Sequence, residues 1–149
     1  MKEKVPISIF KFGFFDKELY DESLKIRKEV FVNEQKVPED EEVEHEEEST
    51  FFLLFYYNIP AATARYRFTD KGVKLERFAT LKKFRGKGLA YILLNYVLED
   101  LKGCKKPIYL HSQAYIVSLY EKAGFVKKGD IFYEAGIPHY LMVLENTES

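Results

Sequence analysis

A short glycine-containing stretch, Arg85-Gly86-Lys87-Gly88-Leu89-Ala90, separates a segment that alternates like a strand from a segment with helical periodicity. Two glycines let the backbone turn tightly and approach a ligand closely. The free N–H groups in the first turn of the following helix would point at that ligand, with the positive end of the helix dipole behind them. The loop also carries positive charge, from Lys82, Lys83, Arg85 and Lys87. The pattern predicts a binding site for a pyrophosphate.

Two other phosphate-binding loops do not fit this stretch. A Walker loop requires the spacing Gly-x-x-x-x-Gly-Lys-Ser/Thr, which the sequence lacks. A dinucleotide fingerprint, Gly-x-Gly-x-x-Gly, would begin at Gly86, but Tyr91 stands where its third glycine is needed. The remaining alternative is an ordinary helix start that happens to contain glycines.

The elements around this loop follow from hydrophobic periodicity. Strands are expected near 7–12, 51–57, 61–68, 73–80 and 108–110, and closing strands near 125–126, 131–133 and 140–144. Helices are expected near 19–31, 89–101 and 114–123. This order predicts an α/β (α+β) fold in a single domain over residues 1–149. Antiparallel strands followed by strand–helix–strand crossovers indicate one mixed central sheet of about seven strands with helices on both faces.

Three segments together resemble a known family. The loop 85–90 resembles the R-x-x-G-x-A/G signature of the GNAT superfamily of acyl-CoA-dependent N-acetyltransferases. Glu76-Arg77-Phe78-Ala79-Thr80-Leu81 resembles the fourth strand of that family. Leu119-Tyr120-Glu121-Lys122-Ala123-Gly124-Phe125 resembles its FYEKxGF segment, with Leu119 in place of the usual aromatic residue.

Further segments resemble the small bacterial branch of ElaA-like or YjcF-like proteins. They are Arg27 to Gln35, then Gln113, then Glu134-Ala135-Gly136-Ile137-Pro138-His139. The matching pieces occur in the right order over nearly the whole chain. The resemblance therefore implies the GNAT fold.

The resemblance also implies a binding mode for acetyl-CoA as co-substrate. The pantetheine arm would lie along the fourth strand and bond the backbone around Phe78, Ala79 and Thr80. The pyrophosphate would bind the amides of Arg85, Gly86, Lys87, Gly88, Leu89 and Ala90. Gln113 and Tyr120 complete the expected contacts. The acyl group would enter a gap between the fourth strand and the fifth, at 108–111.

The implied reaction is direct acetyl transfer from the thioester to an amine. Tyr120 occupies the position of the family's general acid, so it is expected to protonate the departing thiolate. Four residues are candidates for the general base: Glu34, Glu76, His111 and Glu134. Glu34 is the first choice, because it lies in a segment that matches the branch. An amine with a low pKa would need no dedicated base.

Four residues are expected on the acceptor side: Glu34, Arg65, Glu134 and His139. Arg65 would bind an anionic group of the acceptor or pair with an acid on a solvated face. His139 would contact substrate or be a hydrogen-bonded structural residue.

The charge distribution is uneven. The chain has 23 basic and 24 acidic side chains and a net charge of -1, which argues against a globally basic nucleic-acid binder. Eight of the acids lie in residues 39–48, so the rest of the chain is basic and suits an anionic ligand. The acidic run is expected to be a solvated, mobile loop. It would alternatively attract a cationic amine by its long-range field.

The remaining features of the sequence concern the cellular location of the protein, its metal and partner requirements, and the alternative functions. The lone Cys104, the absence of a leader-like N-terminus and the shortness of the apolar run 51–57 favour a cytoplasmic protein without a membrane span. The histidines and the cysteine show no metal-ligand spacing, so no metal is expected. An aromatic content of 16% is compatible with a homodimer. A non-catalytic acyl-CoA-binding module and an interaction protein on the same scaffold are the alternatives, and the acceptor amine cannot be read from the sequence.

Overall fold

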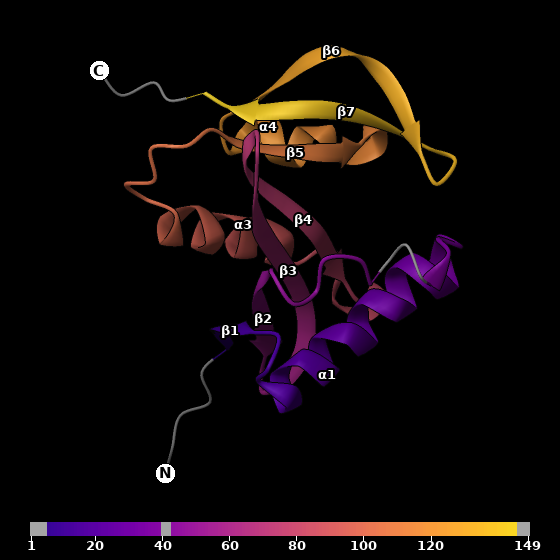
Figure 1. Ribbon diagram of the computed structural model, residues 1–149. Helices are drawn as coiled ribbons and strands as arrows, with labels where there is room; N and C mark the ends of the chain where they lie inside the picture. The colour runs from indigo at the N-terminus through magenta and orange to yellow at the C-terminus, as the bar shows by residue number, and fades with distance from the viewer. Residues whose placement is uncertain (1–5, 40–42, 146–149) are drawn as a thin grey trace.

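Seven strands form one mixed sheet in the order β1-β2-β3-β4-β5-β7-β6 (Figure 1). The structure is a computed structural model that describes residues 6–39 and 43–145. The strands are β1 (Ile7–Gly13), β2 (Thr50–Tyr56), β3 (Ile59–Thr69), β4 (Gly72–Thr80), β5 (Ile108–Gln113), β6 (Phe125–Glu134) and β7 (Ile137–Leu144). Neighbouring strands are antiparallel except for β4 and β5, which are parallel.

The helices lie in the expected order along the chain. They are α1 (Lys17–Arg27) with its π-helical continuation η1 (Lys28–Glu34), the 3₁₀ turn η2 (Lys82–Phe84), α3 (Leu89–Asp100), the 3₁₀ turn η3 (Ala114–Ile116) and α4 (Val117–Lys122). The expected helix over 114–123 is thus a 3₁₀ turn followed by a short α-helix. Among the described residues, none of the helices has both the length and the apolar run that crossing a bilayer requires.

The closing part of the sheet differs from the expectation in one respect. The two apolar pieces 125–126 and 131–133 belong to a single strand, β6, rather than to two. The pairing of β6 with β7 is irregular between Lys128 and Phe132. This irregularity interrupts the alternation of apolar side chains, which is why the sequence suggested two separate strands.

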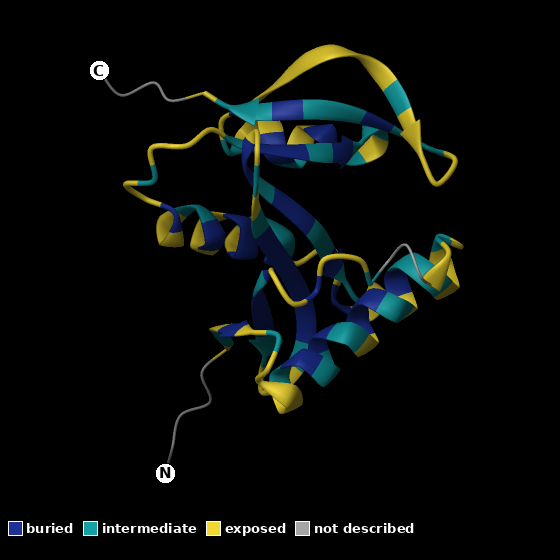
Figure 2. Ribbon diagram, in the orientation of Figure 1, coloured by how far each residue is buried: buried dark blue, intermediate teal, exposed yellow. Residues whose placement is uncertain are grey.

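Strand β2 shows why helices cover both faces of the sheet. Successive side chains of a strand point to opposite faces, and four consecutive residues of β2 are fully buried. Phe51 and Leu53 pack in one hydrophobic cluster with Ile26 of α1. Phe52 and Leu54 pack in the other cluster, which contains the buried residues of α3 and α4. The central strands are therefore buried on both sides, while the outer faces of the helices are exposed (Figure 2).

The parallel strands β4 and β5 are paired only at one end. Their pairing ends at Leu75 and Leu110, and beyond this point the strands diverge (Figure 1). On the other side of β4, Arg77 and Phe78 together oppose the single residue Ala64 of β3, which forms a β-bulge. Arg77 has a φ of 57°, an uncommon value for a residue with a side chain. The bulge bends β4 where it separates from β5.

A buried ionic cluster joins the acidic segment to the α1 face of the sheet. The carboxylate of Glu46 accepts a hydrogen bond from Tyr20 at 2.7 Å and one from Arg65 of β3 at 2.5 Å. It also lies 2.9 Å from Nη1 of Arg27 in α1. Both arginine side chains are only 1% exposed, and Glu46 is 8% exposed.

This cluster corrects two expectations. The acidic run is not a solvated loop throughout, because Glu46 is buried, although Glu44, Glu47 and Glu48 are exposed. Residues 40–42 of the run lie outside the described residues. Arg65 pairs with acids as expected, but in the interior instead of on a solvated face. A buried arginine needs a paired carboxylate, which explains why an acid from the run lies in the core.

Candidate active site

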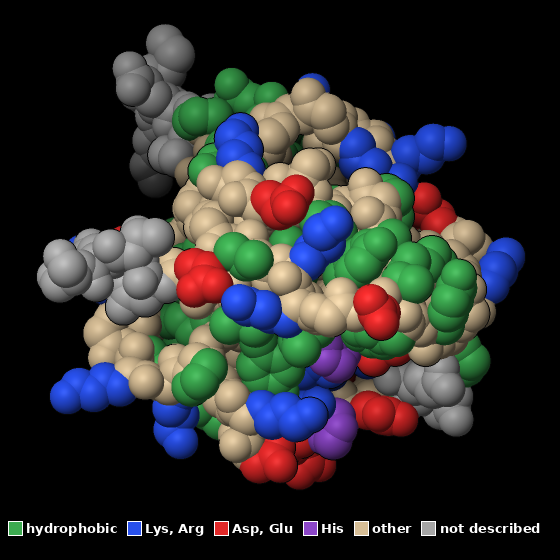
Figure 3. Space-filling model, turned by 90° about the horizontal axis from the view of Figure 1, so that it is seen from above, with side chains coloured by type: hydrophobic (Ala, Val, Ile, Leu, Met, Phe, Trp, Pro, Cys, Tyr) green, Lys and Arg blue, Asp and Glu red, His purple; other side chains and the backbone are tan. Residues whose placement is uncertain are grey.

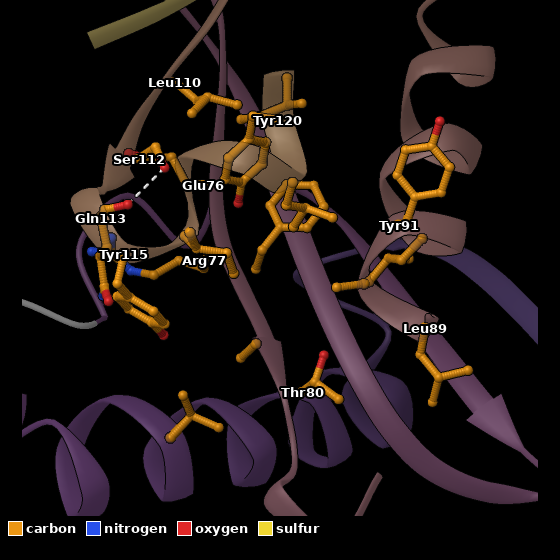
Figure 4. A pocket seen from close by; sticks show the side chains of 18 of the residues that line it. Glu76, Arg77, Thr80, Leu89, Tyr91, Leu110, Ser112, Gln113, Tyr115 and Tyr120 are labelled. Atoms are coloured by element: carbon orange, nitrogen blue, oxygen red, sulfur yellow. Dashed lines mark hydrogen bonds between the residues drawn. The ribbon is translucent and has the colours of Figure 1, made fainter. Parts of the chain in front are cut away.

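The divergence of β4 and β5 opens a first cavity of about 540 Å³. Its walls come from β4, from the loop before α3 and the first turn of α3, and from β5, η3 and α4 (Figure 4). The expected residues Phe78, Ala79, Thr80, Arg85, Gly86, Gly88, Leu89, Ala90, Gln113 and Tyr120 all line it. Lys87 does not line it, and its Nζ lies 5.4 Å from the ring centroid of Tyr56.

The loop at one end of this cavity depends on glycine for its backbone conformation. Gly86 and Gly88 have φ values of 82° and 77°, and a Cβ atom at either position would meet nothing within 4 Å. The space at both positions would admit a side chain. Glycine is therefore required there only because the backbone is left-handed. Gly88 is the N-cap of α3, and no side chain caps the first turn. The first-turn N–H groups of a 12-residue helix are thus available to an anion.

Arg85 links this loop to the end of η1. Its two terminal nitrogens donate to the two carboxylate oxygens of Glu34 at 3.0 and 2.8 Å. Its Nε donates to the carbonyl of Thr80 at 3.0 Å. The hydrogen bonds from Arg85 lower the pKa of Glu34. Glu34 does not line the first cavity, so the structure gives it a positioning contact in place of the expected base.

The middle of the cavity contains unpaired strand backbone. Beyond Leu75, the edge of β4 that faces β5 has no strand partner in the described part of the chain. Phe78, Ala79 and Thr80 lie on this stretch and line the cavity. Backbone N–H and C=O groups without a partner strand can bond an extended ligand that contains amides.

Tyr120 of α4 points its hydroxyl group into the same cavity (Figure 4). Its ring contacts Phe78 and Phe125 edge-to-face, with ring centroids 6.0 Å apart in each pair. Burial, with a smaller contribution from Tyr115, raises the pKa of the phenol above its ordinary value of 10.0. The group is therefore protonated at neutral pH and can donate a proton or a hydrogen bond.

A cluster of two histidines and a carboxylate lies on β5, β6 and β7. Nδ1 of His111 lies 3.1 Å from one oxygen of Glu134, and Nε2 of His139 lies 3.7 Å from the other. The hydrogen bond from His111 lowers the pKa of Glu134 in spite of the opposing effect of burial. Nδ1 of His139 lies 2.7 Å from the carbonyl of Ile137. All three clustered side chains line the first cavity, so Glu134 and His139, both expected on the acceptor side, lie together there.

Glu76 is surrounded by cations. It lies 3.0 Å from Arg65, 2.9 Å from Arg67 and 3.2 Å from Lys74. Burial alone would raise the pKa of Glu76, but the surrounding cations, above all Arg65, lower it to about 2. Glu76 is consequently a very weak base. Arg65, which was expected on the acceptor side, lies behind Glu76 and lines neither this cavity nor the next.

A second cavity of about 410 Å³ adjoins the first. The two share a wall formed by Phe31, Lys74, Glu76, Arg77, Gln113, Glu134 and His139. Arg67, Glu44 and His45 line only the second cavity. Among the described residues, no group of three His, Cys, Asp or Glu side chains is placed to hold a metal ion.

Sequence reasoning did not single out three of these residues. Arg67 and Lys74 face Glu76 from neighbouring positions on β3 and β4, and the alternation of charge with apolar residues there was the available signal. Gln35 exchanges amide hydrogen bonds with Gln113 at 2.8 and 3.3 Å. Gln35 ends the segment 27–35 that matches the branch, so that segment carried the signal for it.

Comparison with known proteins identifies the family to which this chain belongs. Residues 15–146 match the sequence profile of a family described as "Acetyltransferase (GNAT) domain". The chain belongs to the GNAT family. YjcF of Bacillus subtilis (strain 168), described as an uncharacterized N-acetyltransferase, is 33% identical over 131 residues, which cover 86% of this chain and 94% of YjcF.

Two solved structures confirm the GNAT fold, each with a TM-score of 0.81. An acyl-CoA N-acyltransferase from Pseudomonas aeruginosa is 27% identical, and ElaA of Escherichia coli is 25% identical. Each comparison covers 93% of this chain and 99% of the solved chain. The resemblance to GNAT proteins of the ElaA-like or YjcF-like branch is thereby confirmed. GNAT acetyltransferases use acetyl-CoA, so membership supports acyl-CoA N-acyltransferase activity.

Proposed function

We propose that this protein transfers the acetyl group of acetyl-CoA directly to the amine of a small molecule or peptide. The observation that carries the proposal is the gap between β4 and β5, with uncapped helix amides at one end and the Tyr120 hydroxyl inside it. The pyrophosphate would bind at Gly86, Gly88 and the first turn of α3. The pantetheine amides would bond the free edge of β4, which places the thioester near Tyr120 and the wall shared with the second cavity.

The chemistry needs an amine nucleophile and two proton transfers. The amine nitrogen attacks the thioester carbonyl carbon, so a C–N bond forms and the C–S bond breaks. The sulfur leaves as a thiolate and takes the Tyr120 proton, and the nitrogen loses one proton to a base. A phenol whose pKa is raised by burial remains the proton donor throughout the neutral range.

His111 is the best placed base among the four candidates. Both oxygens of Glu34 are taken by Arg85, and Glu76 has a pKa of about 2. The Glu134 carboxylate can only accept, so the proton between it and His111 lies on Nδ1 of the imidazole. Nε2 of the neutral ring then holds a lone pair and can take the amine proton.

Replacing His111 by glutamine is expected to lower kcat/KM about 100-fold at neutral pH. Glutamine has no ring nitrogen with a lone pair, so the variant cannot take the amine proton at this position. The charged groups around this base are Glu134 in direct contact, and His139 and Lys74, whose charges act on Glu134. An unchanged kcat/KM in His111→Gln would remove His111 from this role.

The binding of acetyl-CoA tests the proposed donor site. Ligand at 100 times its Kd should stabilise the fold by about 2.7 kcal/mol, which raises the unfolding midpoint by about 5–10 °C for a chain of this size. Gly88→Ala should reduce the midpoint rise at a fixed, subsaturating acetyl-CoA concentration, because alanine disfavours a φ of 77° and the first-turn amides would move.

Gly103→Ala is the matched control for that variant. Gly103 has a φ of 88°, its Cβ would also meet nothing within 4 Å, and it does not line the first cavity. Both variants should lose similar stability without ligand, and only Gly88→Ala should lose the response to acetyl-CoA. No midpoint rise in the wild type at millimolar acetyl-CoA would contradict the proposal.

A further inference from the structure

We propose that the second cavity binds an acceptor that carries a carboxylate as well as the reacting amine, as a free amino acid does. This inference rests on the proposed acetyl transfer and adds the chemical class of the acceptor. The amine would lie at the shared wall beside Glu134 and His111. The carboxylate would lie beside Arg67, which lines only the second cavity, and beside Lys74.

The shared wall fixes where the amine must be. A nucleophile in the second cavity can reach a thioester in the first only where the two cavities meet. Glu134 and His139 line both cavities, and His111 pairs with Glu134 at 3.1 Å. The wall therefore offers the ionised carboxylate of Glu134 to an incoming ammonium, and His111, which lines only the first cavity, can take a proton from the nitrogen there.

The part of the second cavity formed by β3 and β4 is cationic. Arg67 and Lys74 line it, and each side chain is 16% exposed. Their shared partner is the buried carboxylate of Glu76, to which Arg65 also donates. Three cations thus surround one carboxylate. Among the described residues, Glu76 is the only acid within 4 Å of Arg67, and the contact uses Nε of its guanidinium.

Apart from Glu76, the acids that line the second cavity come from other elements. Glu134 is on β6, and Glu44 is on the exposed segment that precedes the buried Glu46. The cavity thus has cations on β3 and β4, and carboxylates on β6 and on the segment from residue 43. Histidine side chains lie among acidic and basic ones on the face seen in Figure 3. A zwitterion matches this separation of charge better than a diamine, which would place an ammonium group against Arg67 and Lys74.

Matched pairs of acceptors test this inference. CoA release would be followed with amino acids, with the corresponding amino acid amides and with a diamine, all at saturating acetyl-CoA. An amide keeps the amine and loses the carboxylate charge. A charge-assisted contact to Arg67 should make kcat/KM at least about 10-fold higher for the acid than for its amide.

Variants of Arg67 and Lys74 test whether these two side chains cause the preference for acceptors with a carboxylate. Arg67→Gln should raise KM for amino acids about 10-fold or more, leave KM for acetyl-CoA unchanged and narrow the difference between acid and amide. Lys74→Gln should act in the same direction, which keeps the inference testable if Arg67→Gln folds poorly. Lys71→Gln is the control, since Lys71 is exposed in the turn before β4 and lines neither cavity.

The outcomes separate this inference from the proposed function. Preference for amides or diamines over amino acids would overturn the inference and leave acetyl transfer intact. If amino acids are acetylated but neither Arg67→Gln nor Lys74→Gln raises their KM, the assignment of the acceptor carboxylate to the second cavity is wrong. No amine-dependent CoA release with any of these acceptors would contradict the proposed function and the inference with it.

Discussion

Replacing Tyr120 by phenylalanine is expected to lower kcat about 100- to 10,000-fold while leaving the Kd for acetyl-CoA within about twofold. The phenylalanine ring keeps the contacts with Phe78 and Phe125. The variant therefore removes only the hydroxyl group that points into the first cavity. Without that proton donor, the sulfur must leave as a free thiolate.

The pH dependence gives a second readout for the same residue. Burial raises the pKa of Tyr120 above 10.0, and the protonated phenol is the form that we propose as proton donor. Activity should therefore show no loss from ionisation of Tyr120 as pH rises to 10. Tyr96→Phe is the control, because Tyr96 is exposed on α3 and does not line the first cavity. Equal kcat values for Tyr120→Phe and Tyr96→Phe would contradict the assigned role.

Replacing Glu46 by glutamine is expected to lower the free energy of unfolding by about 3 kcal/mol. Glutamine has the shape of glutamate but no charge. The buried Arg27 would therefore lose its ion pair with the Glu46 carboxylate, and Arg65 would lose one of its two ion pairs among the described residues. For a chain of this length the unfolding midpoint should fall by about 6–12 °C. Thermal unfolding followed by circular dichroism measures this shift.

A neighbouring acid provides the matched control. Glu47 follows Glu46 in the same acidic run and is exposed. Glu47→Gln makes the same chemical change and should alter stability by no more than about 0.5 kcal/mol. Equal effects of the two substitutions would show that the run acts through its total charge, and that the pairing of Glu46 with two arginines is not a main source of stability.

Local sequence signals predicted the elements that hold the proposed donor site. The β2–β3 hairpin, β4 and α3 were all expected, because alternation, helical periodicity and glycine at a helix start act over a few residues. The loop 85–90 was singled out on the same grounds. The structure places Gly86, Gly88, Leu89 and Ala90 on the wall of the first cavity.

Long-range pairing could not be read in the same way. Composition marks 39–48 as acidic but cannot tell that Glu46 is the acid that meets two buried arginines. Glu34 and Arg85 are 51 positions apart, so their ion pair exists only once η1 lies beside the loop. The bulge at Arg77 has no glycine to mark its positive φ. Each of these features depends on how distant elements pack.

The most direct test of the account is CoA release with acetyl-CoA and a mixture of free amino acids, with the acetylated product identified by mass spectrometry. The account predicts release that depends on the amine, with the acetyl group on its nitrogen. It also predicts that this release is lost in Tyr120→Phe. Binding of acetyl-CoA without amine-dependent release, for amino acids, amides and diamines alike, would contradict it and indicate a non-catalytic acyl-CoA-binding module.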